Sequence, residues 1–379
     1  MTSLPIRIPL SQPEITEAEV DAVVQVLRSS RLSLGPKLEE FERAIAEYVC
    51  AQQAVALSSG TSGLCLGLQA LCIGEGDEVI VPSFAFVAAA NAIRYVRAAP
   101  VFVDIDPVTL NLDPEAVRQA ITPRTRAIMA VHTFGCPADL GALLRLADDH
   151  GLYLVEDACE ALGAEYENQK VGVLGKFGVF SFYPNKPITT GEGGVLVTQD
   201  AALASTVRAL RNQGRSDQDN WNQHSVVGYN HRLPEMSCAL GIAQLSRIES
   251  ILARRRELAR KYRESLMVYC PGIELPPLDV RNGRIAWFCF VPRLPFGFTD
   301  GSRDLVIRKM DALGIQCRAY FSPVHKMQPY SQHSGCELPV TTDLSGRTLA
   351  LPFFNQLCSQ QILEVCHSLR DVLSSLTTA

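Results

Sequence analysis

The sequence predicts an α/β protein with a large domain, built on a mostly parallel central sheet flanked by helices, and a smaller C-terminal α/β domain. Two observations indicate this fold class. Short, continuously apolar segments alternate with helical segments through the first two-thirds of the chain, as in parallel sheets that are covered on both faces. The 379 residues exceed the length of one typical domain, and βα units become fewer after residue 250. We therefore expect a large domain over 1–250 and a small domain over 251–379.

Two helices are expected before the first strand. Thr16 and Glu19 have the spacing of a capping box, which opens a helix with an apolar face. Pro36 suits the first position of a second helix, in which Leu38 and Phe41 begin one apolar face. The N-terminal helices are assigned to the large domain.

The strands of the central sheet are expected at short apolar runs. These runs fall at 54–57, 79–81, 101–103, 127–131 and 152–155, with helices at 64–71, 114–121 and 138–149 between several of them. Two close strands at 179–182 and 195–198 flank a loop that contains glycine and proline, and a helix follows from about residue 202.

The C-terminal part shows a different pattern of expected helices and strands. Helical periodicity resumes near Glu235, and the Arg- and Glu-rich stretch 245–266, which includes Arg255, is expected to be a solvated helix face. Strands are expected near 287–291 and 316–320, and a final helix from Ser359.

Composition excludes several classes of protein. Hydrophobic residues make up 47% and charged residues 20%, which argues against a disordered chain, a coiled coil or a fibre. The net charge of −5 argues against non-specific nucleic-acid binding, and no apolar stretch is long enough to span a membrane. Twelve cysteines without CxxC spacing indicate reduced thiols in a cytoplasmic protein and no metal site.

A phosphate site is one interpretation of the segment 58–63, Ser-Ser-Gly-Thr-Ser-Gly. It joins an expected strand to an expected helix, where backbone N–H groups and the helix dipole favour an anion. It lacks the Lys-Ser/Thr of a Walker A loop. An ordinary strand–helix turn remains the alternative.

Two acidic residues, Glu156 and Asp157, close the expected strand 152–155. Ligands of open α/β sheets bind beyond the carboxyl ends of the strands. A carboxylate there suits a metal, a ribose or a cationic ring nitrogen, and a helix N-cap at Asp157 is the structural alternative.

Lys186 lies in a loop between Pro184 and Pro187, whose rings restrict the backbone. Most lysines are solvated, but a lysine in a rigid, apolar setting can present a neutral amine that forms an imine. Phe84 and Phe86 follow another expected strand, where they suit either core packing or stacking on a planar ring.

Taken together, these four signals match one cofactor. Pyridoxal phosphate needs a phosphate cradle, an aromatic face, a carboxylate for its ring nitrogen and a lysine for its aldehyde. Each signal by itself is unspecific, but the set as a whole favours this cofactor.

The sequence resembles the DegT/DnrJ/EryC1/StrS family of pyridoxal-phosphate-dependent nucleotide-sugar aminotransferases, within the fold-type I, aspartate-aminotransferase-like superfamily. The resemblance covers most of the chain, and the ordered motifs that carry it lie at 34–36, 59–62, 81–87, 90–91, 102–104, 132–135, 156–161, 181–186, 190–194, 228–232, 320–325 and 351–352.

The resemblance implies a role for each matching position. Lys186 matches the Schiff-base lysine and Asp157 the partner of the pyridine nitrogen; these two are the expected catalytic residues. The other expected cofactor contacts are Gly60, Thr61, Ser62 and Ser181 at the phosphate, Phe86 on the ring, and Asn230, which reaches the cofactor of the neighbouring subunit in the family's dimers.

Glu160 departs from the family pattern, since relatives often carry Gln or His at this position near the ring hydroxyl. A carboxylate beside a phenolate oxygen would be protonated or turned away, because two anions repel each other. It is retained as an expected cofactor contact.

Lys186 also favours one branch of the family, because relatives that carry His at this position are dehydratases. The resemblance then implies transfer of an amino group, with pyridoxamine phosphate as the intermediate cofactor form. The expected donor is L-glutamate, and the acceptor is a nucleotide-linked keto-6-deoxy sugar, 4-keto before 3-keto. Such a product serves polysaccharide or glycoside biosynthesis, with O-antigen among the possible pathways. Arg232 and His325 are candidates for binding the diphosphate, and a homodimer with shared active sites is expected.

Two alternatives stay open at this point. Cys336, in the polar segment 331–336, resembles the nucleophile of another fold-type I enzyme, a cysteine desulfurase. A regulator that binds pyridoxal phosphate without turnover is the second, because a fold does not determine a function.

Overall fold

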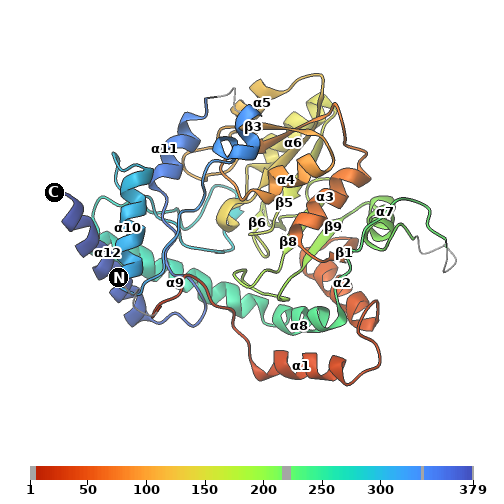
Figure 1. The fold of residues 1–379 in the computed structure, drawn as a ribbon, viewed down its shortest axis with the longest axis horizontal. Coiled ribbons are helices and arrows are strands. Elements are labelled where there is room, and N and C mark those ends of the chain that lie inside the picture. Colours follow the sequence, from red (N-terminus) through yellow and green to blue (C-terminus); the bar gives the residue numbers. More distant parts are fainter. Residues whose placement is uncertain (1–5, 216–222, 334–336, 378–379) are drawn as a thin grey trace.

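The structure, a computed structural model, describes residues 6–215, 223–333 and 337–377 (Figure 1). Its helices are α1 (Glu17–Leu27), α2 (Pro36–Val49), α3 (Gly60–Ala70), α4 (Ala88–Tyr95), α5 (Pro114–Ala120), α6 (Leu140–His150), α7 (Ala201–Arg211), α8 (Glu235–Leu245), α9 (Ile248–Tyr269), α10 (Asp300–Ala312), α11 (Pro339–Arg347) and α12 (Ser359–Thr377). Its strands are β1 (Gln53–Leu57), β2 (Glu78–Pro82), β3 (Ala99–Val103), β4 (Thr125–Val131), β5 (Tyr153–Asp157), β6 (Glu165–Tyr166), β7 (Gln169–Lys170), β8 (Gly178–Ser181), β9 (Gly194–Thr198) and β10 (Gly283–Arg284). Short 3-10 helices lie at Thr133–Gly135, Val324–Lys326 and Gln328–His333.

The central sheet has seven strands in the order β1-β9-β8-β5-β4-β2-β3. Strands β8, β5, β4, β2 and β3 pair in parallel, whereas β9 is antiparallel to both of its neighbours. The predicted strands of the first 200 residues are therefore confirmed. A second sheet, β10-β6-β7, has three short antiparallel strands.

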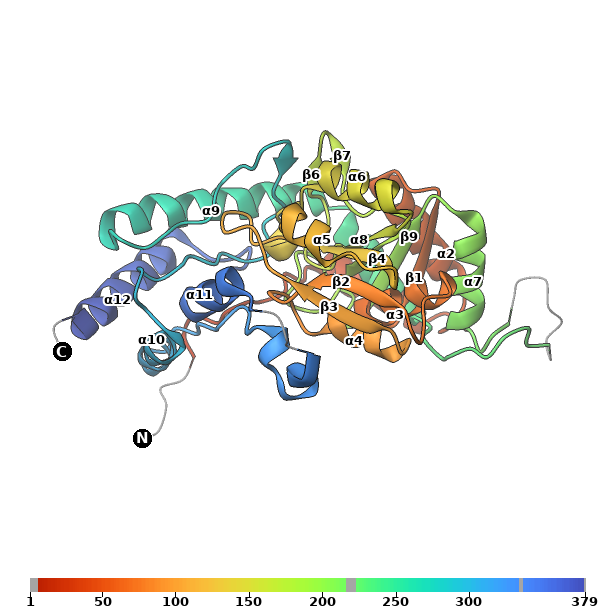
Figure 2. The ribbon, with the colours of Figure 1, turned by 90° about the horizontal axis from the view of Figure 1, so that it is seen from above.

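Helices cover both faces of the central sheet, as the continuous apolar strands predict (Figure 2). Alternate residues of β1 enter two different cores: Ala54 and Ala56 pack with residues of α2, α5 and α6. Val55 and Leu57 pack with residues of α3, α4 and α7. The α/β fold with a mostly parallel, two-sided sheet is confirmed.

The starts of α1 and α2 follow from local capping. The Thr16 backbone N–H and hydroxyl both contact the Glu19 carboxylate, which confirms the predicted capping box. At α2 the buried carboxylate of Glu235 accepts the N–H groups of Gly35, at 3.0 Å, and Leu38, at 2.9 Å. This carboxylate replaces the partners that a helix start lacks.

Helix α9 connects the central sheet to the C-terminal part, and Figure 1 shows it running from α8 toward α12. Its first turns, with Ile248 and Ile251, belong to the core beside the sheet. Its later turns, with Leu258 and Tyr262, share another core with α10 and α12. Ile8 packs in that second core as well. The division at 250/251 falls within α9 and stays a prediction.

The predicted strands near 287–291 and 316–320 are wrong. These segments make only single-residue bridges, Phe290 with Leu351 and Arg318 with Ala350. The run 287–291 is apolar because it is buried, but the backbone carbonyls of residues 287 and 288 accept the guanidinium of Arg255 at 2.7 Å each. They are therefore not available to a neighbouring strand.

Arg255 also corrects the expected solvated face of α9. Arg255 is only 3% exposed, and burial lowers the pKa of its guanidinium to about 10. Its remaining bond goes to the Asn355 side-chain oxygen at 3.0 Å. Arg255 and its neighbour Arg254, which donates to the carbonyls of Asn355 and Leu357, thus fasten the C-terminal part to α9, whereas Arg260 is exposed.

We predict that Arg255→Met lowers the free energy of unfolding by about 3 kcal/mol or more, because it leaves buried carbonyl oxygens without donors. Arg260→Met on the same helix is the control and should change it by less than about 0.5 kcal/mol. Urea unfolding followed by circular dichroism measures both. Equal effects of the two substitutions would contradict this role of Arg255.

Candidate active site

A cavity of about 540 Å³ lies at the carboxyl ends of the sheet strands. It is lined by Ser59, Gly60, Thr61, Phe86, Ala88, Val131, Asp157, Cys159, Glu160, Ser181, Tyr183, Asn185, Lys186, Glu192, Phe288, Tyr320 and Phe321. These residues come from the loops that follow β1, β2, β5 and β8 and from two C-terminal segments. This is the edge at which open α/β sheets bind ligands.

Strand pairing explains why Asp157 and Lys186 share this cavity. Strands β5 and β8 are parallel neighbours, with Asp157 opposite Val179. Strand β8 ends at Ser181, and the loop to β9 carries Lys186 back over the same edge. The Lys186 backbone N–H donates to the Tyr183 carbonyl at 2.9 Å, which closes a turn at the lysine.

The Lys186 side chain is only 12% exposed and lies between a carboxylate and an aromatic ring. Its Nζ is 3.5 Å from Glu160 Oε1 and 4.0 Å from the centroid of the Phe288 ring. Both neighbours attract an ammonium group. The lysine is therefore restrained and largely buried as predicted, but its setting is not purely apolar, because the Glu160 carboxylate lies beside the amine.

Glu160 points toward Lys186 and is not turned away from the cavity. Its other oxygen accepts the Phe134 backbone N–H at 2.9 Å, and Phe134 takes a positive φ of 57° in the turn that presents this N–H. Burial raises the pKa of Glu160, while Lys186 and the Phe134 N–H act in the opposite direction.

The start of α3 forms a cradle on another wall of the cavity. Ser59 caps the helix by accepting the Ser62 N–H at 3.1 Å, and the first N–H groups of a helix have no partner within it. A Cβ at Gly60 would lie 2.7 Å from Cys159 Sγ and 3.0 Å from Ser181 Cβ. This close approach explains why the position is glycine. The absence of a Cβ also leaves this end of the cavity open for an anion.

Aromatic rings form the remaining wall. Phe86 is 62% exposed, and its ring centroid lies 6.3 Å from that of Phe321. Phe321 also packs on Phe134, at 5.2 Å between centroids. Burial raises the pKa of the adjacent Tyr320 to about 12. Phe86 therefore presents an open face to the cavity, whereas Phe84 is buried in the core.

Seven predicted site residues line this one cavity, namely Gly60, Thr61, Phe86, Asp157, Glu160, Ser181 and Lys186. Four others do not line it in this chain. Ser62 is buried, and its hydroxyl donates to the Ser59 carbonyl at 2.8 Å. Asn230 is exposed, and Arg232 donates to the Asn212 side-chain oxygen at 3.0 Å. His325 is the fourth.

His325 is buried and joins the C-terminal part to the end of β2. Its Nδ1 lies 2.6 Å from Ser83 Oγ, and its backbone N–H donates to the same oxygen at 3.1 Å. The next residue back, Val324, donates to the Ser83 carbonyl at 2.9 Å. His325 thus fastens the segment that carries Tyr320 and Phe321 beside Phe86.

Sequence reasoning gave no role to several cavity residues, above all Phe288, Tyr320 and Phe321. They lie more than 100 residues after Lys186 in the chain. The aromatic pair Tyr-Phe at 320–321 was the available signal, but an aromatic pair is usually a core feature. Only tertiary packing brings it to the cavity.

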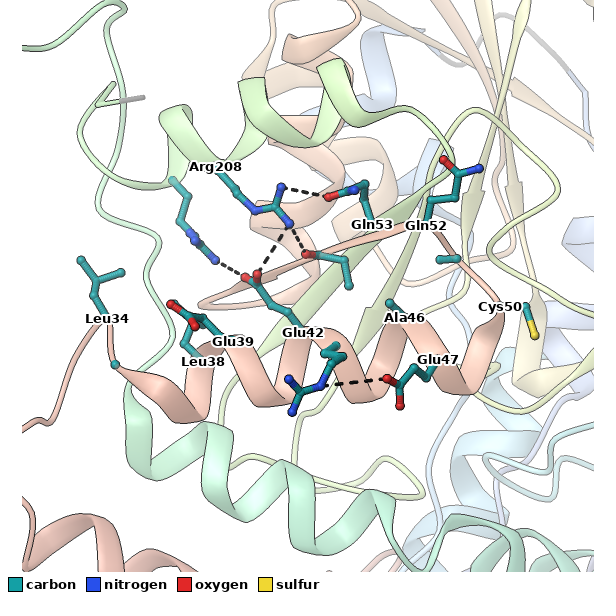
Figure 3. Close-up of a pocket in the computed structure, with 15 residues that line it drawn as sticks. Leu34, Leu38, Glu39, Glu42, Ala46, Glu47, Cys50, Gln52, Gln53 and Arg208 are labelled. Atoms are coloured by element: carbon teal, nitrogen blue, oxygen red, sulfur yellow. Dashed lines mark hydrogen bonds and ion pairs between the residues drawn. The ribbon is translucent and has the colours of Figure 1, made fainter. Parts of the chain in front are cut away.

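A second, larger hollow of about 840 Å³ lies between α2, β1 and α7 (Figure 3). None of the predicted site residues lines it. Its charges are compensated locally, because Glu42 pairs with Arg211 at 2.6 Å and with Arg208 at 3.7 Å. This hollow is separate from the candidate active site.

The described residues hold no group of three His, Cys, Asp or Glu side chains arranged for a metal ion. The cysteines in this part of the chain are free thiols, and Cys336 lies outside the described residues. No helix within the described ranges is long and apolar enough to cross a membrane.

Comparison with known proteins identifies relatives over nearly the whole chain. A model of the DegT/DnrJ/EryC1/StrS aminotransferase family matches residues 13–370. GDP-perosamine synthase of Caulobacter vibrioides is 39% identical over 374 residues, which cover 98% of this chain and 100% of that protein. The spore coat polysaccharide biosynthesis protein SpsC of Bacillus subtilis is 36% identical, with 97% of each chain covered.

Solved structures agree with these relatives. DesV of S. venezuelae, in complex with a ketimine intermediate, is 37% identical with a TM-score of 0.88, covering 97% of this chain and 98% of that one. Spr1654 of Streptococcus pneumoniae, in its PMP form, is 26% identical with a TM-score of 0.92, covering 98% and 100%. The fold and family are therefore those of a transaminase. The chain belongs to the DegT/DnrJ/EryC1/StrS aminotransferase family, as its motifs predict.

The His325 contact predicts a pH dependence of stability. Burial lowers the pKa of His325, nearby Lys326 lowers it further, and Asp104 opposes the shift. At pH values below the unfolded-state histidine pKa of about 6.5, this histidine therefore binds more protons in the unfolded chain than in the folded chain. The free energy of unfolding contributed by this site falls as pH decreases through that window.

We predict that His325→Gln makes unfolding less sensitive to pH below about 6.5, as measured by urea unfolding at a series of pH values. His150→Gln, at an exposed position on α6, is the control and should keep the wild-type pH dependence. An unchanged slope in His325→Gln would contradict the assignment.

Proposed function

We propose that this aminotransferase moves an amino group from L-glutamate to a nucleotide-linked 4-keto-6-deoxy sugar, to give a 4-amino-4,6-dideoxyhexose for polysaccharide or glycoside biosynthesis. The observation that carries the proposal is the presence of Lys186 and Asp157 in one cavity with the N-terminus of α3. GDP-perosamine synthases and sugar aminotransferases among the relatives support the substrate class.

The cofactor is pyridoxal phosphate, and the solved relative Spr1654 is known in a PLP form and a PMP form. The cavity residues fit this group. The cradle at Gly60, where a Cβ would meet Cys159 and Ser181, suits the phosphate together with the Thr61 hydroxyl. Phe86 offers an open aromatic face, and Asp157 offers a buried carboxylate to a ring nitrogen.

When bound, pyridoxal phosphate supplies an aldehyde that condenses with amines and a ring that delocalises electrons. Lys186 would hold the aldehyde carbon until the amine of the donor displaces it, and its Nζ, then free, would take the proton from the α-carbon of the donor. Asp157 would keep the ring nitrogen protonated, because an opposite charge favours the protonated form. Phe288 and the aromatic wall limit access of water to Lys186.

The charge of the cavity supports a homodimer with shared active sites. Among the described lining residues, Asp157, Glu160 and Glu192 are acidic, and Lys186 is the cation. A substrate diphosphate and the donor's carboxylates need further cations. We assign Arg232 to this role, and Asn230 to the phosphate of the cofactor in the neighbouring subunit, since both lie outside the cavity of their own chain.

His325 is retained as a candidate contact of the diphosphate, although its Nδ1 is engaged with Ser83. Its Nε2 is the atom left for a substrate, since the Ser83 hydroxyl occupies Nδ1. The desulfurase and regulator alternatives have no specific observation in their favour, and the family assignment favours transamination.

Amino transfer is tested with a panel of GDP-, UDP- and dTDP-linked 4-keto-6-deoxy and 3-keto-6-deoxy sugars, each with glutamate. We expect a product whose mass corresponds to replacement of the keto oxygen by an amine on a 4-keto substrate. The matched control is enzyme without glutamate. Turnover of the 3-keto sugars alone would contradict the proposed position, and sulfide release from cysteine would favour the desulfurase.

We predict that Asp157→Asn retains pyridoxal phosphate within about tenfold of wild-type affinity but lowers kcat by about 100-fold, because the ring nitrogen loses its anionic partner. Asp149→Asn, at an exposed position on α6, should leave kcat unchanged. Steady-state kinetics and cofactor titration measure the two effects. Unchanged turnover in Asp157→Asn would reject its catalytic role.

A further inference from the structure

Glu156 is fully buried beside Asp157 and lies at the centre of a compact hydrogen-bond network. Its Oε1 accepts the N–H groups of Leu174 at 2.8 Å and Gly175 at 2.7 Å. Its Oε2 accepts the N–H of Gly172 at 2.6 Å and lies 3.0 Å from His132 Nε2. The family assignment and the proposed catalysis give this carboxylate no role.

The contacts of His132 establish which ring nitrogen carries its proton. Its Nδ1 accepts the backbone N–H of Ala138 at 3.0 Å, so Nε2 carries the hydrogen and donates it to Glu156. The His132 backbone N–H also donates to the Asp157 carbonyl at 3.0 Å. His132 follows β4 directly, and it therefore binds β4 to two successive residues of β5.

The segment that Glu156 binds leads into β8. A Cβ at Gly175 would lie 2.6 Å from the Leu154 carbonyl, and Gly172 has a positive φ of 94°. Both positions therefore need glycine for the turn to approach β5 so closely. The same turn is bonded to the backbone of β5, through the Lys176 N–H to Leu154 and the Glu156 N–H to Phe177.

Glu156 thus lies between the two elements that carry the proposed chemistry. One residue onward, β5 ends at Asp157, and the turn on its other side continues through β8 to Ser181 and the Lys186 loop. The Asp157 carboxylate accepts the Cys159 N–H at 3.1 Å and also interacts with the Cys159 thiol, so both contacts go to a residue two positions further along the same segment. The direction of this carboxylate therefore depends on where the end of β5 is held.

We propose that Glu156 and His132 are positioning residues, which fix the Asp157 carboxylate relative to Lys186 by fastening the ends of β4, β5 and β8 to one another. The inference rests on the proposed role of Asp157 toward pyridoxal phosphate. Displacements of about 1 Å in a catalytic arrangement reduce rates by about 100-fold, so the buried network has a functional reason beyond stability.

Glu235 provides a matched control for Glu156. It is also buried and accepts backbone N–H groups, from Gly35, Lys37 and Leu38 at 2.8–3.0 Å. It fastens α2 and does not line the cavity. In both Glu156→Gln and Glu235→Gln, an amide NH₂ replaces one acceptor oxygen and faces N–H donors, so both variants lose stability in the same way.

The experiment compares wild type, Glu156→Gln, His132→Gln and Glu235→Gln, each titrated with pyridoxal phosphate carrying an isotope-labelled ring nitrogen. Thermal unfolding establishes that each variant is folded. We expect Glu156→Gln to weaken affinity by about tenfold and to shift the ring-nitrogen resonance at neutral pH toward the unprotonated form. His132→Gln should shift both in the same direction by less. Glu235→Gln should lower the unfolding temperature and leave affinity and resonance at the wild-type values.

A wild-type resonance in both Glu156→Gln and His132→Gln would overturn the positioning role, and so would equal shifts in Glu156→Gln and Glu235→Gln. If Glu156→Gln does not fold, His132→Gln decides by the same criteria, since it disturbs one of the four contacts. Failure of the wild-type protein to bind pyridoxal phosphate would instead contradict the proposed function and is distinguished by that titration.

Discussion

The parallel pairing of β5 with β8 is the constraint on which the candidate site depends. Because the two strands run in the same direction, the residues that follow them emerge at one edge of the sheet. Asp157 at the end of β5 and Lys186 in the loop after β8 therefore face one cavity. Asp157 and Lys186 are 29 positions apart in the chain. The pairing of β5 with β8, together with the turn that Glu156 binds, is sufficient to bring them to the same cavity.

Electrostatics then determines what the cavity of one chain can do alone. Lys186 is held between Glu160, 3.5 Å from its Nζ, and the face of the Phe288 ring. The remaining acidic residues suit a cationic ring and oppose anionic substrates. A substrate that carries a diphosphate must therefore be met by cations from outside this lining, which is the physical reason for assigning Arg232 and a second subunit to the complete site.

Local patterns in the sequence were sufficient to predict the central sheet and the place of Asp157 at the end of a strand. The apolar strands, the capping box at Thr16 and the strand-end position of Asp157 depend on nearby residues, and the structure agrees with them. The same reasoning failed where long-range contacts decide the outcome. The run 287–291 has the composition of a strand, but its first two backbone carbonyls accept hydrogen bonds from Arg255. Tyr320 reaches the cavity only through tertiary packing.

In the proposed chemistry, Lys186 holds the aldehyde carbon of the cofactor. Borohydride reduction of the protein loaded with pyridoxal phosphate, followed by proteolysis and mass spectrometry of the peptides, tests it most directly. We expect one reduced phosphopyridoxyl group, on Lys186 of the peptide that contains the loop between β8 and β9. A group found on a different lysine, or a loaded protein from which all cofactor is released after reduction, would contradict it.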